Sequence, residues 1–581
     1  MLCPKGGSKS IVENKELYLS KPWLKYYPKG VPPTAEIPNK SLVDLFDESA
    51  DKYSNRPAVI FYGNKITYKQ LQDEVNRFAT ALAQLGVKKG DKVALYLLNS
   101  PQYIIAYFSI LKVGGTVTPI SPVYTSSEVK HQLTDSGART LVCQDILYDN
   151  IAKTGVKLDR IFLTGISDYL PTIRRMIGKS VLRKAFSELE VPTPKIDEHE
   201  GFYRMKDLIN KTEPRPPKVE IDPAVDLAVL PFTGGTTAQP KGAMLTHRNL
   251  VAITTQIQAV WPILEEGKEI YPAFLPFYHI YAQVALMLTS LFMSGTMILF
   301  TTPDVDDILY SVEKYQATAF LGVPTFFEYL KEYEKTDRVN WKRLKMIICG
   351  ADTLHQTTLE DWTRRTGSEI TEGYGMTETS GVSHVNPFGR RKPGSFGLPL
   401  PNITAAIINP ETNEFLPLGE TGEMILHGPN MMQGYWNRDE DNKKIFLDVD
   451  SMRFMRTGDL VSMDEEGYFT FYERSKDLIK FKGYSVFARE IEEILTKHQQ
   501  IKACGVIGVP DPKVGQYIKA NIVLNPEARG KISEEDIISY CKENLAHYKV
   551  PKIVEFRGEL PKTDVGKISR RELREELDEE V

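Results

Sequence analysis

Two patterns that mark particular classes of protein are missing from this 581-residue sequence. Basic residues do not exceed acidic ones, and the net charge of -4 provides no basic field of the kind that nucleic-acid binding uses. The few cysteines are scattered without the C-x-x-C spacing of a zinc site or a disulfide framework. They are Cys3, Cys143, Cys349, Cys504 and Cys541. We therefore expect no nucleic-acid partner, and the cysteine pattern fits a reducing cytoplasm best.

Long apolar runs are also scarce. The first residues, MLCPKGGSKS, lack the apolar core of a signal peptide. One uncharged stretch, residues 277–300, is long enough to span a bilayer. However, Gly295, His279 and several hydroxyls interrupt it, and no basic cluster flanks it. We expect a buried helix followed by a buried strand there.

The composition is that of a folded globular protein, with 42% hydrophobic and 25% charged residues, and the length predicts at least two domains. Thr67 and Gln70 have capping-box spacing ahead of apolar residues at helical intervals, and Gly86 suits the end of a helix, so a helix is predicted over 67–86. Apolar strand patterns then alternate with helices, at 227–232, 297–300, 317–323 and 344–350. This alternation predicts an α/β fold with largely buried sheets.

The pattern changes after about residue 400, where short strands separated by turns predict a small β-rich subdomain. The last part of the chain has the pattern of a compact α+β module, with two helices at 488–498 and 533–546 and strands at 501–509 and 517–524. We place the boundary at Lys476. Residues 1–475 would form a large N-terminal domain of two α/β subdomains plus the β-rich subdomain, and residues 476–581 a small C-terminal domain.

The segment TGGTTAQPKG, residues 233–242, gathers three glycines, three threonines and a lysine. Glycines let backbone N–H groups approach an anion closely, and hydroxyls and an ammonium group can complete the cradle. The order of residues is neither that of a P-loop nor that of a dinucleotide fingerprint. The segment therefore predicts a phosphate-binding loop of another type, against the alternative of a flexible surface loop.

This segment resembles the phosphate loop of the adenylate-forming superfamily, which comprises acyl-CoA synthetases, luciferases and peptide-synthetase adenylation domains. It departs from the usual form, near [YF]TSGTTGxPKG, at Gly234 and Ala238. Further segments resemble the other motifs of that family in the same order, and together they cover essentially the whole chain. They are LPFYHIYA (275–282), CGADTL (349–354), EGYGMTET (372–379), MRTGDL (455–460), ERSKDLIKFKGY (473–484) and PKTDVGKISR (561–570).

The resemblance implies roles for individual residues around ATP and Mg²⁺. The set expected at the β- and γ-phosphates is Thr233, Gly235, Thr236, Thr237 and Lys241. Thr377 would donate to the α-phosphate and Glu378 would coordinate Mg²⁺, a hard cation that prefers carboxylate oxygen. The set expected at the adenine and ribose is Gly350, Ala351, Tyr374, Asp459 and Arg474.

The implied chemistry has two steps, with a mobile C-terminal domain between them. A carboxylate attacks the α-phosphorus of ATP while Lys567 bridges the two reactants, and the acyl-AMP then passes its acyl group to a thiol. Rotation about the hinge residue Lys476 would withdraw Lys567 and bring Lys480, Lys482 and Gly483 to the coenzyme A side. The family's hinge segment usually begins Gly-Arg, whereas here it begins Glu473-Arg474.

Two segments indicate a fatty acid as the substrate. KPWLKYYPKGVP, residues 21–32, is similar to the N-terminal segment of long-chain fatty-acid CoA ligases. Residues 168–190 lie where those enzymes have inserted length, and their interleaved cations and apolar residues predict either a membrane-surface helix or a solvated surface helix. The acyl pocket is expected to be apolar, with candidates Tyr278, His279, Val323 and Phe326, and also Trp261, Phe277, Tyr281 and Thr325.

We therefore expect an ATP-dependent, AMP-forming ligase that joins a medium- or long-chain fatty acid to coenzyme A. It would be cytoplasmic, with peripheral membrane contact and a homodimer as open alternatives. The other readings are the same chemistry on a short, hydroxylated or aromatic acid, acyl transfer to a carrier protein, and nucleotide binding without catalysis.

Overall fold

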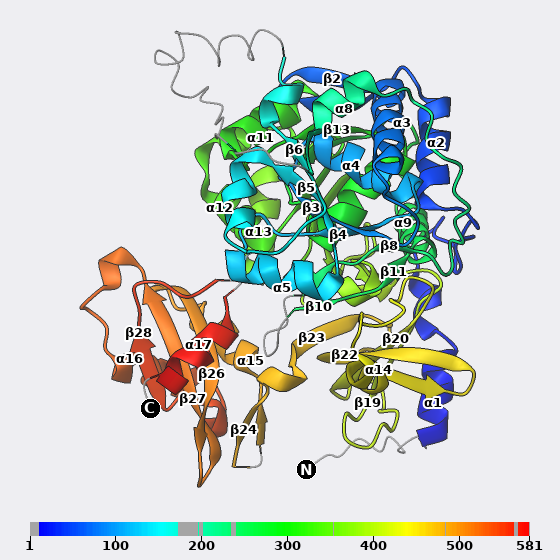
Figure 1. The fold of residues 1–581 in the computed structure, drawn as a ribbon. Coiled ribbons are helices and arrows are strands. Elements are labelled where there is room, and N and C mark those ends of the chain that lie inside the picture. Colours follow the sequence, from blue (N-terminus) through cyan, green and yellow to red (C-terminus); the bar gives the residue numbers. More distant parts are fainter. Residues whose placement is uncertain are drawn as a thin grey trace.

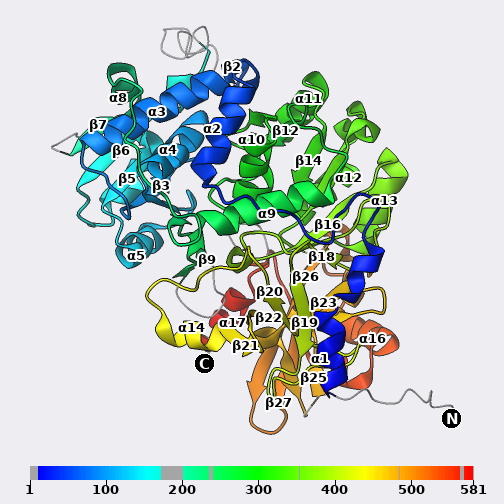
Figure 2. The same cartoon turned by 90° about the vertical axis from the view of Figure 1, so that its right-hand side faces the viewer.

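The fold was obtained as a computed structural model, and it confirms the predicted α/β class. The structure describes residues 11–171, 196, 201–233, 240–352, 354–482, 484–562 and 568–579. Figures 1 and 2 show a large body built from the first four fifths of the sequence, with the orange-to-red C-terminal segment beside it.

The first large sheet has seven strands, ordered β11-β8-β4-β3-β5-β6-β7. All neighbours are parallel except β11 and β8. The bounds are β11 (Leu245–Thr246), β8 (Leu227–Val229), β4 (Thr116–Pro119), β3 (Lys92–Tyr96), β5 (Thr140–Gln144), β6 (Arg160–Thr164) and β7 (Phe202–Arg204). The central strands are buried almost throughout, which is why they appear in the sequence as continuous apolar runs.

Two further sheets meet edge to edge and form the second α/β part. One has the order β12-β13-β1-β2, with β12 (Ile270–Ala273), β13 (Thr296–Leu299), β1 (Pro57–Phe61) and β2 (Asn64–Thr67). The other has the order β14-β15-β16-β17-β18, with β14 (Ala319–Gly322), β15 (Met346–Cys349), β16 (Thr371–Tyr374), β17 (His384–Val385) and β18 (Leu398–Pro399). Thr318 N–H donates to Ile270 O at 3.0 Å where the two edges meet. Strands β14 to β16 are parallel, so their carboxyl ends lie at one edge.

Helices surround the sheets of the large body, and the first of them, α1, packs on strand β19 (Thr404–Ile408). They are α1 (Ile11–Leu19), α2 (Leu42–Lys52), α3 (Tyr68–Gln84), α4 (Pro101–Lys112), α5 (Ser126–Ser136), α6 (Tyr148–Ala152), α8 (Met205–Lys211), α9 (His247–Val260), α10 (Thr289–Phe292), α11 (Val305–Lys314), α12 (Pro324–Glu332) and α13 (Gln356–Thr366). The predicted capping box at Thr67 and Gln70 is present at the start of α3, and the chain turns at Gly86 with φ +84. The helix predicted over 67–86 is therefore confirmed.

The uncharged stretch 277–300 is buried inside the large body. A π-helical segment, η6 (Ala282–Leu288), runs into α10, and β13 follows. Every residue of η6 is buried, which confirms the prediction of a buried helix and strand. Among the helices that the structure describes, none is both long and apolar enough to cross a membrane. Most of the 168–190 segment lies outside the described residues.

The β-rich subdomain predicted after residue 400 is present and leads directly into the C-terminal segment. Its strands are β19 (Thr404–Ile408), β20 (Gly422–His427), β21 (Phe446–Val449), β22 (Met452–Met463) and β23 (Phe469–Arg474), with helix α14 (Asp439–Ile445). The C-terminal segment has the sheet order β25-β24-β27-β26, with β28 on β27. Its elements are β24 (Ile479–Phe481), β25 (Tyr484–Val486), α15 (Ala488–Leu495), β26 (Ile501–Asp511), β27 (Gly515–Leu524), α16 (Glu534–Asn544), β28 (Ile553–Phe556) and α17 (Arg570–Glu579).

The apolar core divides between these two parts. The core of the large body extends to Phe469, with Phe471 packed against it. A second core begins at Ile479 and includes Ile491, Ile522 and Ile537. The nine residues between Phe469 and Ile479 therefore connect two separately packed bodies. They include the rest of β23 and the short helix η10 (Ser475–Asp477).

Candidate active site

The predicted phosphate loop is held at its base by a short hairpin. Strand β9 (Phe232–Thr233) enters the loop and β10 (Lys241–Gly242) leaves it, and Thr233 pairs with Lys241 across the two strands. The two ends of the loop are thus side by side, as a loop that encloses an anion requires. Gly235, Thr236 and Thr237 lie outside the described residues.

Lys241 is held by residues from a distant part of the sequence. Its Nζ lies 2.9 Å from Asp441 Oδ1 of α14 and 5.3 Å from the centre of the Tyr435 ring. Two backbone hydrogen bonds fix this arrangement: Met244 N–H donates to Gly434 O at 2.9 Å, and Trp436 N–H donates to Gly242 O at 2.8 Å. The ammonium group is therefore oriented by a carboxylate and an aromatic face.

Glu378 lies in a short 3₁₀ turn, η9 (Thr377–Thr379), just after β16. It is 6% exposed, and Tyr435 Oη donates to its Oε1 at 2.6 Å. Burial and this carboxylate raise the pKa of Tyr435, so the phenol keeps its proton and remains a donor. The same tyrosine thus contacts both Glu378 and Lys241. A carboxylate oxygen of this kind suits Mg²⁺, and Thr377 in the same turn supplies a hydroxyl.

Asp459 is buried between a phenol and a guanidinium group. Tyr374 Oη donates to Asp459 Oδ2 at 2.5 Å, and Arg474 Nε lies 3.4 Å from Oδ1. The Asp459 carboxylate raises the pKa of the Arg474 guanidinium, and burial opposes that effect. Asp459 is 2% exposed, and its Oδ1 accepts no hydrogen bond from the described residues. A buried carboxylate oxygen with spare acceptor capacity fits the hydroxyl groups of a ribose.

The predicted adenine-flanking residues follow the carboxyl ends of adjacent parallel strands. Gly350 and Ala351 follow β15, and Tyr374 ends β16. Ala351 has φ +74, a left-handed conformation that a residue with a side chain rarely adopts outside a constrained site. Tyr281 lies directly against Gly350, because a Cβ placed there would be 3.0 Å from Tyr281 Cζ. The predicted nucleotide side and the predicted acyl side therefore share this contact.

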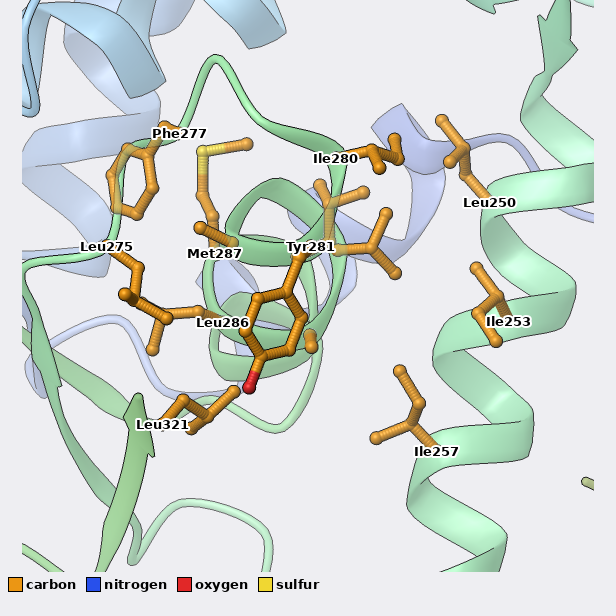
Figure 3. Close-up of a cluster of buried hydrophobic side chains, with 14 of the residues drawn as sticks. Leu250, Ile253, Ile257, Leu275, Phe277, Ile280, Tyr281, Leu286, Met287 and Leu321 are labelled. Atoms are coloured by element: carbon orange, nitrogen blue, oxygen red, sulfur yellow. The ribbon is translucent and has the colours of Figure 1, made fainter. Parts of the chain in front are cut away.

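Tyr281, one candidate for the acyl pocket, belongs to a cluster of buried apolar side chains that includes one face of α9. Figure 3 shows Leu250, Ile253 and Ile257 of α9 directed toward the segment that contains Ile280 and Tyr281, with Leu321 of β14 nearby. The other candidates differ in their surroundings. Tyr278, His279 and Val323 are half-buried, Phe326 stacks on Phe274 at 4.7 Å between ring centres, Phe277 packs against Tyr103, Trp261 is buried, and Thr325 is exposed.

The predicted hinge lies in η10, where Lys476 is exposed. Strand β24 follows with Lys480, and Lys482 comes in the next turn; Figure 1 shows β24 at the lower edge of the C-terminal body, on the side away from β10. Helix α17 instead lies on the side of the large body, and Arg570 at its start is 2.8 Å from Glu473. Gly483 and Lys567 lie outside the described residues.

Three residues at the site have no counterpart in the sequence-based prediction. Tyr435 and Asp441 contact Lys241, and His384 packs edge-on against Tyr374 with 5.8 Å between ring centres. Tyr435 belongs to the run GYWN, residues 434–437, whose glycine and two aromatic residues were the signal available. The sequence of that run does not indicate which segment it pairs with, because its partners Gly242 and Met244 lie almost 200 residues earlier in the sequence.

Known proteins share both parts of this architecture. Residues 46–436 match the AMP-binding enzyme family, and residues 490–567 match the AMP-binding enzyme C-terminal domain. A long-chain-fatty-acid–CoA ligase of Bacillus subtilis (strain 168) is 37% identical over 560 residues, which cover 96% of this chain and 98% of the relative. One of Escherichia coli O6:H1 is 36% identical over 566 residues, with the same two coverages. Among solved structures, ATP-bound MatB from Rhodopseudomonas palustris has a TM-score of 0.78 and 30% identity, covering 92% of this chain and 98% of that one.

Proposed function

The chain belongs to the AMP-binding enzyme family, and from that premise we propose that it is an ATP-dependent, AMP-forming fatty acid–CoA ligase. It activates a medium- or long-chain fatty acid as acyl-AMP and transfers the acyl group to coenzyme A. The observation that carries this proposal is the buried Asp459, which contacts Tyr374 and Arg474 and whose Oδ1 accepts no hydrogen bond from the described residues. The choice of a fatty acid as the substrate rests on the Bacillus subtilis and Escherichia coli relatives, because both are named for that substrate.

In the first step, a carboxylate oxygen of the acid attacks the α-phosphorus of ATP and pyrophosphate leaves. The residues mainly position the reactants and stabilise charge, because negative charge builds on the phosphate oxygens. Thr233, Gly235, Thr236, Thr237 and Lys241 hold the β- and γ-phosphates, and Thr377 donates to the α-phosphate. Glu378 holds Mg²⁺, which neutralises phosphate charge when bound. Gly350, Ala351 and Tyr374 flank the adenine, Asp459 accepts from the ribose with Arg474 beside it, and Lys567 bridges the α-phosphate and the acid.

In the second step, the thiol of coenzyme A attacks the acyl carbonyl, the thioester bond forms, and AMP leaves with the electron pair of the broken acyl–phosphate bond. We assign the domain boundary to Lys476, with residues 1–475 and 476–581 as the two domains. The separate cores that end at Phe469 and begin at Ile479 support this division. Rotation about Lys476 would bring Lys480, Lys482 and Gly483 to the thiol side. The position of β24 on the side away from β10 supports our assignment of this orientation to the first step.

The acyl chain would lie along the apolar face of α9. Ile253 and Ile257 on one side and Ile280 and Tyr281 on the other supply aliphatic and aromatic surface, as a hydrocarbon chain requires. Tyr278, His279, Val323 and Phe326, all half-buried, complete the proposed pocket. Cytoplasmic location, peripheral membrane contact through residues 168–190 and a homodimer are further proposals. Vesicle flotation and light scattering would test the last two.

The test is pyrophosphate release with ATP, Mg²⁺ and coenzyme A across straight-chain acids from two to eighteen carbons, with hydroxylated and aromatic acids alongside. The proposal predicts a maximum at eight carbons or more. A maximum with a short, hydroxylated or aromatic acid would keep the two-step chemistry and overturn the substrate. Normal acyl-AMP formation with little transfer to coenzyme A would instead indicate a carrier protein as the acceptor, and nucleotide binding without pyrophosphate release would exclude catalysis.

A further inference from the structure

A buried acid joins the two bodies of the protein close to the proposed hinge. Glu473 is the penultimate residue of β23, directly before Arg474, and its side chain is only 1% exposed. An ionised carboxylate that is buried to this extent requires charged or hydrogen-bonding partners, since desolvation without them is costly. Those partners show what the residue does.

Two donors from the C-terminal body reach Glu473. Arg570 Nη1 donates to Oε1 at 2.8 Å, and the backbone N–H of Arg489 donates to Oε2 at 3.2 Å. Arg489 is the second residue of α15, so this carboxylate accepts from one of the N–H groups that a helix leaves unpaired at its start. One side chain of the large body thus contacts the start of α15 and the start of α17 together.

Arg570 is fixed from its other side by a residue of its own body. Its Nε and Nη2 donate to the Glu492 carboxylate at 3.1 and 2.5 Å, while Nη1 remains directed at Glu473. A guanidinium held by two carboxylates has a defined orientation. Arg570 follows Lys567 by only three residues in the sequence. The Glu473–Arg570 pair therefore fixes the start of α17 relative to Arg474 and Asp459.

These contacts cross the hinge, whereas a neighbouring ion pair does not. Asp477 Oδ1 lies 2.6 Å from Arg574 Nη2, but both residues follow Lys476 and would move together. Glu473 precedes Lys476, whereas Arg489 and Arg570 follow it, so a rotation at Lys476 must separate Glu473 from both. Of the donors to this carboxylate, only the N–H of Arg474, 3.1 Å from Oε1, lies on the same side of Lys476. The carboxylate would then have to gain water or other donors.

We propose that Glu473 is a positioning residue that, with Arg570, latches the C-terminal domain in the orientation for acyl-AMP formation and is released for thioester formation. This inference rests on the proposed two-step function. It also gives a physical account of the departure from the usual glycine at this position: the acid adds an interdomain ion pair where a glycine would add only backbone freedom. The latch favours the first half-reaction at the expense of the second.

The test compares the two half-reactions in Glu473→Gln. Acyl-AMP formation is followed by exchange of labelled pyrophosphate into ATP, and thioester formation is followed with supplied acyl-AMP and coenzyme A. We expect acyl-AMP formation to fall about tenfold, as for loss of one charge-assisted contact, and thioester formation to stay at or above the wild-type rate. Glu490→Gln is the matched control, because the Glu490–Lys549 pair lies entirely within the C-terminal domain. It should leave the ratio of the two rates unchanged.

Arg570→Lys adds a second, independent variant, since it keeps the charge and loses the forked contact. It should shift the ratio in the same direction, and the double variant should show less than the product of the two separate effects. Equal loss of both half-reactions in Glu473→Gln, or an unchanged ratio, would overturn the latch. If the wild-type protein forms neither acyl-AMP nor thioester with any acid tested, the proposed function fails and the latch with it.

Discussion

Asp459 and Arg474 stand opposite each other in the register of β22 and β23, with Arg474 Nε 3.4 Å from Asp459 Oδ1. The pairing of two neighbouring strands thus places an anion and a cation at the end of β16, where Tyr374 donates to the same carboxylate. Because β23 ends at Arg474 and the proposed hinge lies two residues later, the proposed ribose contacts lie directly beside the proposed hinge.

Asp459→Asn should weaken nucleotide binding. The substitution removes the negative charge that orders Tyr374 and Arg474 and that would accept from the ribose hydroxyls. Loss of such a charge-assisted hydrogen bond corresponds to about tenfold or more in Kd, which calorimetry with AMP would measure. Asp464→Asn is the control from the same subdomain, since Asp464 pairs with Lys392 instead. An unchanged Kd for AMP in Asp459→Asn would remove this residue from the ribose site.

Tyr435→Phe should raise the Mg²⁺ concentration needed for nucleotide binding. The phenol orients Glu378 through a 2.6 Å hydrogen bond, and loss of a group that orients a metal ligand commonly costs about tenfold in metal affinity. Binding of a non-hydrolysable ATP analogue across a Mg²⁺ titration would measure the shift without catalysis. Tyr468→Phe is the matched control, because its hydroxyl donates to Arg390 O away from Glu378. Equal Mg²⁺ dependence in the two variants would contradict the role given to Tyr435.

Lys567→Ala should separate the two half-reactions. An ammonium group that bridges the α-phosphate and the attacking carboxylate is needed only while acyl-AMP forms, so pyrophosphate exchange should fall by about a hundredfold or more. Thioester formation from supplied acyl-AMP should be largely spared. Lys562→Ala changes an exposed lysine five residues earlier and should affect neither rate. Equal loss in both half-reactions would refute the two-orientation scheme.

Lys476→Pro should have the opposite effect. Proline fixes φ, so the residue could no longer take up the dihedral change that a rotation of the C-terminal domain requires. Acyl-AMP formation should persist while thioester formation slows by about tenfold or more. Lys476→Ala is the control, because it removes the same side chain and keeps the backbone free. A proline variant that performs both half-reactions at the control rate would place the hinge elsewhere.

Two buried histidines should make the protein less stable in acid. Burial lowers the pKa of His384 to about 3 and that of His247 to about 4, from an ordinary value of 6.5. As the pH falls below 6.5, the unfolded chain takes up protons at these residues while the folded protein does not, so the stabilisation present above 6.5 is progressively lost toward the folded pKa values. The loss is about 1.4 kcal/mol per pH unit for each histidine, or about 2 kcal/mol each by pH 5.

The melting temperature at pH 7 and at pH 5 would measure this loss. In His384→Gln the difference between the two temperatures should be smaller than in the wild-type protein. His355→Gln is the control, because that side chain is 44% exposed and should leave the difference unchanged. The same pH dependence in wild type and His384→Gln would show that this histidine does not resist protonation.

The local structure could be predicted from the sequence wherever a short segment carries its own signal. The capping box at Thr67 begins α3 as expected. The uncharged stretch after Phe277 forms a buried helix and strand, as expected from the glycine, histidine and hydroxyl residues that interrupt it. The α/β class followed from the alternation of such segments. The roles of the site residues came instead from the resemblance of ordered motifs, and those roles remain predictions.

Relationships that depend on long-range packing could not be predicted. Tyr435 and Asp441 reach Lys241 only because the backbone at Gly242 and Met244 pairs with residues 434–436. The ion-pair partner of Glu473 could not be predicted either, since the sequence of a charged hinge segment suggests an acid that is exposed to solvent. Only the folded chain brings it to Arg570, 97 residues later.

The contact between Tyr281 and Gly350 links two properties that are usually engineered separately. The Tyr281 ring forms part of the proposed acyl pocket and also lies against the backbone of Gly350, at the edge of the proposed adenine site. A smaller residue at position 281, introduced to admit a bulkier acid, would leave Gly350 and the strained Ala351 unsupported. We therefore expect substitutions of Tyr281 that alter which acids are accepted to alter the affinity for ATP as well. Variants selected for a new acid would need a second substitution that restores ATP binding.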